Sequence, residues 1–259
     1  MRAIKSTLGL NSKIVIISDI HGNFDALSHL PEDYDELWVL GDLVNYGPQP
    51  AEVISFIRKR ATRVVRGNHD HCVGFGGDLL CAAEFREMAE ATRRYTESVL
   101  SEEDKHYLRN LPLHTDVWVG NIRCRICHAV PSDPPFAYYP SRSEQWEKEC
   151  RRAGANILLV GHGHVPFGCW VGSTLLANPG SLGQPKSGEP VASYAVLKDG
   201  KLSFRSFHYP VNLTAGKVRA MPVPAPIRSE LITVLRTGSV PQGSSQDVFV
   251  GTRRLMVSG

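Results

Sequence analysis

The chain has 259 residues, of which 42% are hydrophobic and 21% are charged, and its formal net charge is +3. This is ordinary for a globular protein with a substantial core, and the charge is too balanced to favour a nucleic-acid polymer or a membrane surface as partner. No apolar run approaches the ~18 residues of a membrane span, and residues 1–11 hold too short an apolar stretch for a signal peptide. We therefore expect a cytoplasmic protein without a membrane partner.

The first part of the chain alternates buried strands with helices. The apolar run KIVIIS at 13–18 predicts a strand, and Asn23 can cap the helix that follows it. A second strand is expected at 36–40, a helix from Pro50, and a short third strand at 63–65. Polar residues follow each strand. In open α/β sheets, the carboxyl ends of the strands are where sites are built.

The later part of the chain mixes helices with hairpins, so we expect mostly antiparallel pairing there. Two packed sheets with outer helices in one core fit this pattern, an α/β fold with mixed sheets. We expect residues 1–210 to form one domain and 211–259 a helical extension with a loosely held tail. The expected ranges are helices at 78–100, 101–111 and 143–153, a hairpin of 116–119 with 122–129, a strand at 157–160, hairpins of 165–170 with 173–177 and of 193–197 with 201–207, and helices near 213–221 and 227–237.

Cys124 to His128 matches the haem-attachment pattern C-x-x-C-H. We reject a haem here because the segment alternates like a strand. A zinc ribbon would need a second C-x-x-C, which the sequence lacks. Cys124 and Cys127 are therefore expected to be reduced, buried strand residues.

Five short blocks of metal-ligand-type residues follow the predicted strands. Carboxylates, imidazoles and amide oxygens suit hard and borderline divalent ions. Within two of the blocks the ligand types are two residues apart, which places them on one side of an extended segment. A single block would most often be a cap or a turn, but five in this order predict a two-metal hydrolytic centre. The blocks are DIH at 19–21, GD at 41–42, GNHD at 67–70, His128, and GHGH at 161–164.

These blocks resemble the calcineurin-like metallophosphoesterase superfamily. The segments IISDIHGNFDAL, WVLGDLVNYGPQP, VVRGNHD, VGHGHVPF and NPGS are similar to its compact prokaryotic members, over about residues 14–207. The resemblance implies a four-layer α/β/β/α sandwich. It also implies hydrolysis of phosphomonoesters or phosphodiesters by a hydroxide that bridges two divalent metal ions.

The resemblance also implies a role for each block residue. His69 would be the general acid that protonates the leaving oxygen. Manganese is the expected metal, with iron, zinc, cobalt or nickel as alternatives. One ion would be held by Asp19, His21, Asp42 and His164, and the other by Asp42, Asn68, His128 and His162.

The chain departs from the family at one position. Many members have G-D-x-x-D, whose second aspartate orients the acid histidine, but this chain has Asn45 there. An asparagine can accept a hydrogen bond from the histidine but cannot stabilise an imidazolium by charge. We therefore predict a weak general acid and a preference for good leaving groups. Asp70 is a second, geometrically strained candidate for orienting His69.

Several alternatives stay open. The substrate is expected to be a small phosphorylated compound or a nucleotide, and a diadenosine tetraphosphate-type hydrolase is one alternative to a simple esterase. A catalytically inactive metal-binding scaffold is another. A nuclease would need a basic track, and the best cluster, at 58–63, is equally well explained as a solvated helix end. Tyr138 and Tyr139 could stack on a base or cover the core, and Gly180 and Ser181 should make a turn near the site.

Overall fold

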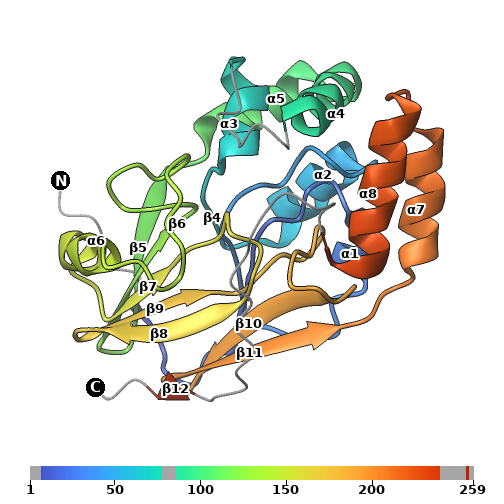
Figure 1. Ribbon diagram of the computed structural model, residues 1–259. Helices are drawn as coiled ribbons and strands as arrows, with labels where there is room; N and C mark the ends of the chain where they lie inside the picture. The colour runs from blue at the N-terminus through green and yellow to red at the C-terminus, as the bar shows by residue number, and fades with distance from the viewer. Residues whose placement is uncertain (1–6, 78–85, 240–254, 257–259) are drawn as a thin grey trace.

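Two six-stranded sheets packed face to face form the centre of the computed structural model, which describes residues 7–77, 86–239 and 255–256 (Figure 1). The first sheet has the order β12 (Leu255–Met256), β11 (Lys201–Phe207), β10 (Ala192–Lys198), β2 (Ile14–Ile17), β3 (Glu36–Val39) and β4 (Arg63–Val64). The second has the order β1 (Thr7–Leu8), β5 (His114–Val119), β6 (Ile122–Cys127), β7 (Ile157–Leu159), β9 (Thr174–Asn178) and β8 (Phe167–Val171).

Helices cover both outer faces, which makes four layers. Strand β2 is buried on both sides: Ile14 and Ile16 face the second sheet, whereas Val15 and Ile17 belong to the cluster that includes α1 (Phe24–Ser28) and α2 (Pro50–Arg60). On the far side, Trp146 of α6 (Trp146–Ala153) packs in a cluster with residues of β7 and β9. The expected α/β/β/α sandwich is confirmed.

The later strands pair mostly antiparallel, as expected: β5 with β6, β8 with β9, and β10 with β11. The exceptions are β6, β7 and β9, since β7 lies between the other two and is parallel to both. The β10–β11 hairpin crosses to the first sheet, where β10 lies antiparallel to β2. Turn residues predict which neighbouring strands pair, but they do not determine which sheet the hairpin joins.

The remaining helices lie towards one end of the sandwich (Figure 1). Helix α3, which begins directly after Gly67, was not predicted, and only the second part of the helix expected at 78–100 lies within the described residues. The extension at 211–259 stays a prediction, although α7 and α8 pack against each other and share an apolar cluster with α4. None of the helices described is long and apolar enough to cross a membrane. The bounds are α3 (Asn68–Phe75), α4 (Arg86–Val99), α5 (Glu102–Asn110), α7 (Val211–Ala220) and α8 (Ala225–Thr237).

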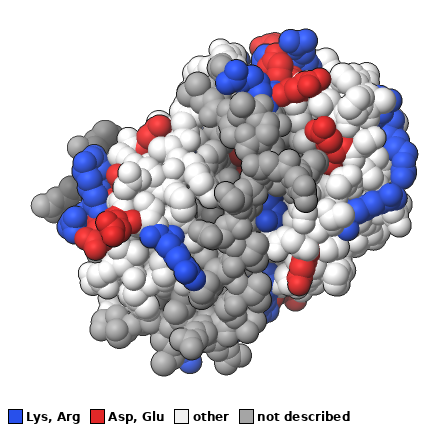
Figure 2. All heavy atoms as spheres, in the orientation of Figure 1, with Lys and Arg blue, Asp and Glu red and all other residues white. Residues whose placement is uncertain are grey.

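Cys124 and Cys127 are buried on β6 with free thiols, as predicted for strand residues. The described charges on the face shown in Figure 2 are mixed around α4 and α5, and basic side chains gather at the edge formed by α7 and α8. In the cluster at 58–63, Arg58 donates to Glu103 at 2.6 Å, as expected of a solvated helix end.

Candidate metal centre

The loops that follow β2, β3, β4, β6 and β7 converge at one end of the sandwich. Strands β2, β3 and β4 are parallel, and so are β6 and β7, so the carboxyl ends within each sheet lie at the same edge. All the predicted site side chains meet there, and all except the half-buried His162 are buried. They are Asp19, His21, Asp42, Asn68, His69, His128, His162 and His164.

Left-handed backbone conformations concentrate at this cluster. The φ angle is 53° at Asp19, 48° at His21, 54° at Asp42, 65° at His162 and 59° at His164. The segments are therefore not extended, so the expectation that residues two apart lie on one side of an extended segment is wrong. The side chains nevertheless converge, because the left-handed turns direct them to the same place. Such angles cost about 1–2 kcal/mol for residues other than glycine. Their clustering indicates a functional constraint.

The glycines of the blocks allow the loops to touch. A Cβ atom on Gly161 would lie 2.0 Å from Ser18 Oγ, and one on Gly67 would lie 2.0 Å from Asp42 Oδ1. Gly163 does not have a positive φ; the histidines on either side of it do. The glycines thus serve close approach, and the histidines themselves make the turns.

Backbone carbonyls fix the orientation of three histidines. Nδ1 of His21 lies 3.1 Å from Val44 O, Nδ1 of His128 lies 2.7 Å from Leu40 O, and Nδ1 of His164 lies 2.7 Å from Gln184 O. A carbonyl only accepts, so each Nδ1 carries the hydrogen, and each ring presents an Nε2 lone pair to the centre when it is neutral. These are the second contacts that orient metal-binding histidines in proteins.

Two carboxylate oxygens face these nitrogens without a hydrogen-bond donor. Asp19 Oδ1 and Asp42 Oδ2 are buried, and neither accepts a hydrogen bond from any described residue. Asp19 Oδ1 lies 3.3 Å from His164 Nε2, and Asp42 Oδ2 lies 3.2 Å from His128 Nε2. The Nε2 atoms of His21 and His164 are only 3.1 Å apart. Facing lone pairs and unpaired buried carboxylates are costly unless a cation lies among them.

The geometry allows two neighbouring ions with Asp42 between them. Asn68 Oδ1 lies 3.1 Å from both His128 Nε2 and His162 Nδ1, which adds an amide oxygen to the second group. His21 also forms a compact group with Asp42 and His69, so by proximity alone His69 could be a ligand. The groups compact enough for one ion are Asp19 with His21 and His164, Asp42 with His128 and His162, and His21 with Asp42 and His69.

Burial and mutual attraction set the charges of these groups. Burial raises the pKa of Asp19 to about 7, although His128 opposes the rise. Burial would raise the pKa of Asp42 as well, but His128 and His69 lower it well below its usual range. Burial disfavours a charged His128, yet the attraction of Asp42 raises its pKa to about 9. Burial lowers the pKa of His162 to about 3. Without a metal ion His128 would therefore carry a proton on Nε2 beside Asp42 Oδ2, and an ion bound by both residues would take the place of that proton.

Asn45 contacts His69, and Asp70 does not orient it. Asn45 Nδ2 lies 2.8 Å from His69 Nδ1. The Asp70 carboxylate instead accepts backbone N–H groups of Asp42, Leu43 and Gly67 at 2.8, 2.8 and 3.0 Å, so the alternative role considered for it is wrong. Burial lowers the pKa of His69 to about 4.

Two further residues, not among the predicted site residues, support the centre. Ser181 is buried and its hydroxyl donates to Asp19 O at 2.7 Å, so this segment lies beside the site, as expected, and contacts its backbone. Asn178 donates to Gly161 O at 2.6 Å and accepts from Gly180 N. The NPGS motif draws attention to Asn178 and Ser181 in the sequence, but it does not predict which backbone groups they contact.

A four-layer α/β/β/α sandwich with this cluster at its strand ends defines a protein of the metallophosphoesterase class. Residues 13–200 match the calcineurin-like phosphoesterase superfamily domain, and the chain belongs to that family.

Two related proteins match most of the chain, and a third matches only a part of it. A metallophosphoesterase from Sphaerobacter thermophilus superposes with a TM-score of 0.73 and 28% identity, covering 88% of this chain and 99% of that one. An uncharacterized protein of Methanocaldococcus jannaschii is 29% identical over 231 residues, 81% of this chain and 93% of its own length. A symmetrical bis(5'-nucleosyl)-tetraphosphatase of Hamiltonella defensa is 41% identical over 63 residues, only 21% of this chain and 23% of that protein.

Proposed function

We propose that this chain hydrolyses phosphomonoesters or phosphodiesters with two divalent metal ions, most readily manganese. Family membership supports a phosphoester hydrolase. The donor set, which is carboxylate, imidazole and amide oxygen without thiolate, suits manganese, iron, zinc, cobalt or nickel. In our proposal Asp19, His21, Asp42 and His164 hold one ion, and Asp42, Asn68, His128 and His162 hold the other.

The pair of orphaned oxygens carries this proposal. Asp19 Oδ1 and Asp42 Oδ2 are buried without donors, in different compact groups, and each faces an imidazole Nε2. A buried carboxylate oxygen without a partner is costly, and a metal ion would satisfy it. One such oxygen in each group favours two ions over one.

The two ions would supply Lewis-acid chemistry, lowering the pKa of a water molecule and neutralising charge on the phosphoryl oxygens. The residues supply the rest. Asp42 would contact both ions. Its Oδ1 accepts the His69 backbone N–H at 3.0 Å, which fixes the position of His69 relative to Asp42. His69 would give a proton from Nε2 to the leaving oxygen.

The Asn45 contact makes His69 a weak acid in this proposal. If the amide Nδ2 donates to Nδ1, the imidazole must be neutral, with its hydrogen on Nε2. An imidazolium needs the amide turned end for end, so that Oδ1 accepts from Nδ1. Neither arrangement adds a negative charge, so esters with good leaving groups should be cleaved best.

A second candidate is hydrolysis of dinucleoside polyphosphates. The partial similarity to symmetrical bis(5'-nucleosyl)-tetraphosphatases favours it, although the match spans less than a quarter of either chain. A phosphoanhydride also has a good leaving group, which suits a weak acid. A metal-binding scaffold without activity is the remaining alternative.

The test is a panel of divalent ions against monoesters, diesters, cyclic nucleotides and diadenosine tetraphosphate. Asp42→Asn should lose turnover and both ions, whereas the exposed His106→Ala is the matched control and should keep them. Metal-dependent turnover of any member supports a hydrolase and ranks the substrate classes. A folded, metal-loaded protein that turns over none of them is a scaffold.

A further inference from the structure

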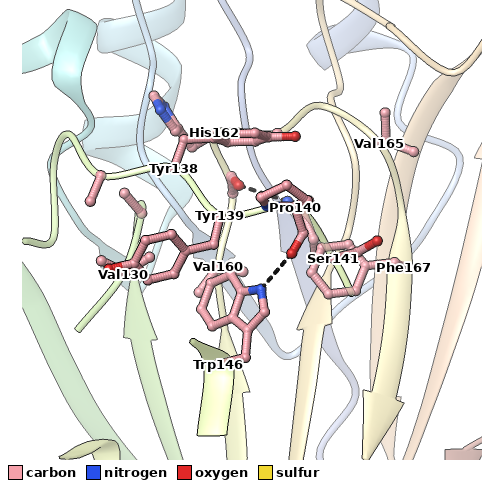
Figure 3. A pocket seen from close by; sticks show the side chains of 15 residues that line it. Val130, Tyr138, Tyr139, Pro140, Ser141, Trp146, Val160, His162, Val165 and Phe167 are labelled. Atoms are coloured by element: carbon pink, nitrogen blue, oxygen red, sulfur yellow. Dashed lines mark hydrogen bonds between the residues drawn. The ribbon is translucent and has the colours of Figure 1, made fainter. Parts of the chain in front are cut away.

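A cavity of ≈120 Å³ adjoins the candidate metal centre on the His162 side (Figure 3). The GHGH segment that carries His162 forms one wall of it. The other walls are mainly aromatic and aliphatic, from the loop at 137–141, from α6 and from β8. Tyr138, Tyr139, Trp146 and Phe167 supply the aromatic rings. A ligand in this cavity would therefore be continuous with a phosphate held at the centre.

The loop that forms the cavity is held in place at several points. Trp146 Nε1 donates to Pro140 O at 2.9 Å, a contact drawn in Figure 3. In the segment that precedes this loop, the buried Glu149 carboxylate accepts from both the backbone N and the hydroxyl of Ser132 at 2.9 Å. A cavity held this way is pre-formed, so a ligand need not order it on binding.

The two neighbouring tyrosines have different roles. Tyr139 packs edge-on against Trp146, with ring centres 5.7 Å apart, so it covers the apolar layer under the loop. Tyr138 is 54% exposed, and its ring centre lies 6.0 Å from that of His162. In Figure 3 the Tyr138 ring extends from beside His162 across the mouth of the cavity.

The Tyr138 ring lies beside Gly163. A Cβ atom on this glycine would lie 3.6 Å from Tyr138 Cε2, which is van der Waals contact, so a larger side chain would push against the ring. Gly163, which lies between the candidate ligands His162 and His164, thus leaves room for the Tyr138 ring.

We propose that this cavity binds the base of a nucleotide ester whose phosphate is at the metal centre, with Tyr138 as the stacking surface. This rests on the proposed phosphoesterase function and names its substrate class. Planar bases stack on aromatic side chains regardless of sequence, and mostly apolar walls with a few polar groups suit them better than a sugar. Ser141 and Asn178 add polar groups to the lining.

Two diesters with the same leaving group isolate the contribution of the nucleoside. Thymidine 5'-(4-nitrophenyl) phosphate and methyl 4-nitrophenyl phosphate both release 4-nitrophenol, so they differ only in the nucleoside. For Tyr138→Ala, kcat/KM of the nucleoside ester should fall about 5- to 140-fold more than that of the methyl ester. Tyr138→Phe should keep the ratio. Trp170→Ala removes an aromatic ring of similar exposure, 44%, outside the cavity and should also keep it.

A calorimetric titration of the manganese-loaded protein with AMP and with ribose 5-phosphate separates this proposal from the proposed function, because it requires no turnover. AMP should bind more tightly, and Tyr138→Ala should abolish the difference. If neither diester is hydrolysed, these two esters are not substrates, the panel of esters and anhydrides decides on the hydrolase proposal, and the titration alone decides on the cavity. Equal losses for both diesters, or equal binding of AMP and ribose 5-phosphate, would overturn the base site.

Discussion

Replacing Asn45 by aspartate would place a carboxylate where an amide now lies 2.8 Å from His69 Nδ1. The change is nearly isosteric. Asn45 has a φ of 69°, and aspartate tolerates this left-handed conformation about as well as asparagine does. The substitution therefore alters charge at the general acid with little change in backbone.

The effect on His69 can be estimated from charge alone. Two unit charges about 4 Å apart attract by about 4 kcal/mol at an effective dielectric constant of about 20. That equals roughly a thousandfold in the ratio of protonated to neutral imidazole. With the pKa of His69 at about 4, chiefly through burial, the ratio at pH 7 would rise from roughly 1:1000 to near 1:1. Burial also disfavours the new carboxylate, so this is an upper limit.

The assay is kcat/KM for a series of phosphate esters whose leaving groups range from nitrophenol to simple alcohols. A better proton donor makes the rate less sensitive to the leaving group, so Asn45→Asp should gain up to about 100-fold on the poorest leaving groups and little on nitrophenol. Asn45→Gly is the control, since it removes the contact and keeps the positive φ. An unchanged slope against leaving-group pKa in the aspartate variant would show that a charged partner does not make His69 a better proton donor.

Three further predictions follow from the centre. Metal binding near pH 7 should release protons, because the pKa of His128 is raised to about 9 and a ligand nitrogen must lose its proton, so metal affinity should fall as pH is lowered. Calorimetry in buffers of different ionisation enthalpy measures the protons released, and finding none would contradict the prediction. Gly161→Ala should lower both the melting temperature and metal content, because its Cβ would lie 2.0 Å from Ser18 Oγ. Asp70→Asn should destabilise the fold by about 1–3 kcal/mol in urea unfolding, because one amide oxygen cannot accept three backbone N–H groups.

Matched variants serve as controls for the predictions on Gly161 and Asp70. Gly216 lies in α7 with nothing within 4 Å of a Cβ atom and no positive φ, so Gly216→Ala should stabilise by up to about 1 kcal/mol. If Gly161→Ala behaves like it, the loops do not need the close approach. Asp104 has a partly exposed carboxylate that caps α5, so Asp104→Asn should cost less than Asp70→Asn. An equal cost would mean that the three N–H contacts of Asp70 contribute little.

The layers of the fold and the membership of the site could be predicted because their signals are local. Buried runs such as 13–18 mark strands, and a ligand-type block directly after a strand lies at its carboxyl end. Helix α3 could also have been found, since Gly67 is followed three residues later by Asp70, whose carboxylate accepts the Gly67 N–H.

The rest of the site depends on contacts that are distant in sequence. Asp70 binds N–H groups of residues 42 and 43, which lie 28 and 27 positions away, and adjacency to His69 suggested the wrong partner. The left-handed angles at Asp19 and His21 have no local sequence signal, because neither residue is glycine. Tyr138 and Tyr139 are identical in type, and only the position of Trp146 separates their roles.

Anomalous diffraction from crystals grown with manganese would show whether Asp42 lies between two bound ions. We predict two peaks, roughly 3.5–4 Å apart, one on each side of the Asp42 carboxylate. The first should lie among Asp19, His21 and His164, and the second among Asn68, His128 and His162. A single peak, or peaks that do not flank Asp42, would contradict this prediction.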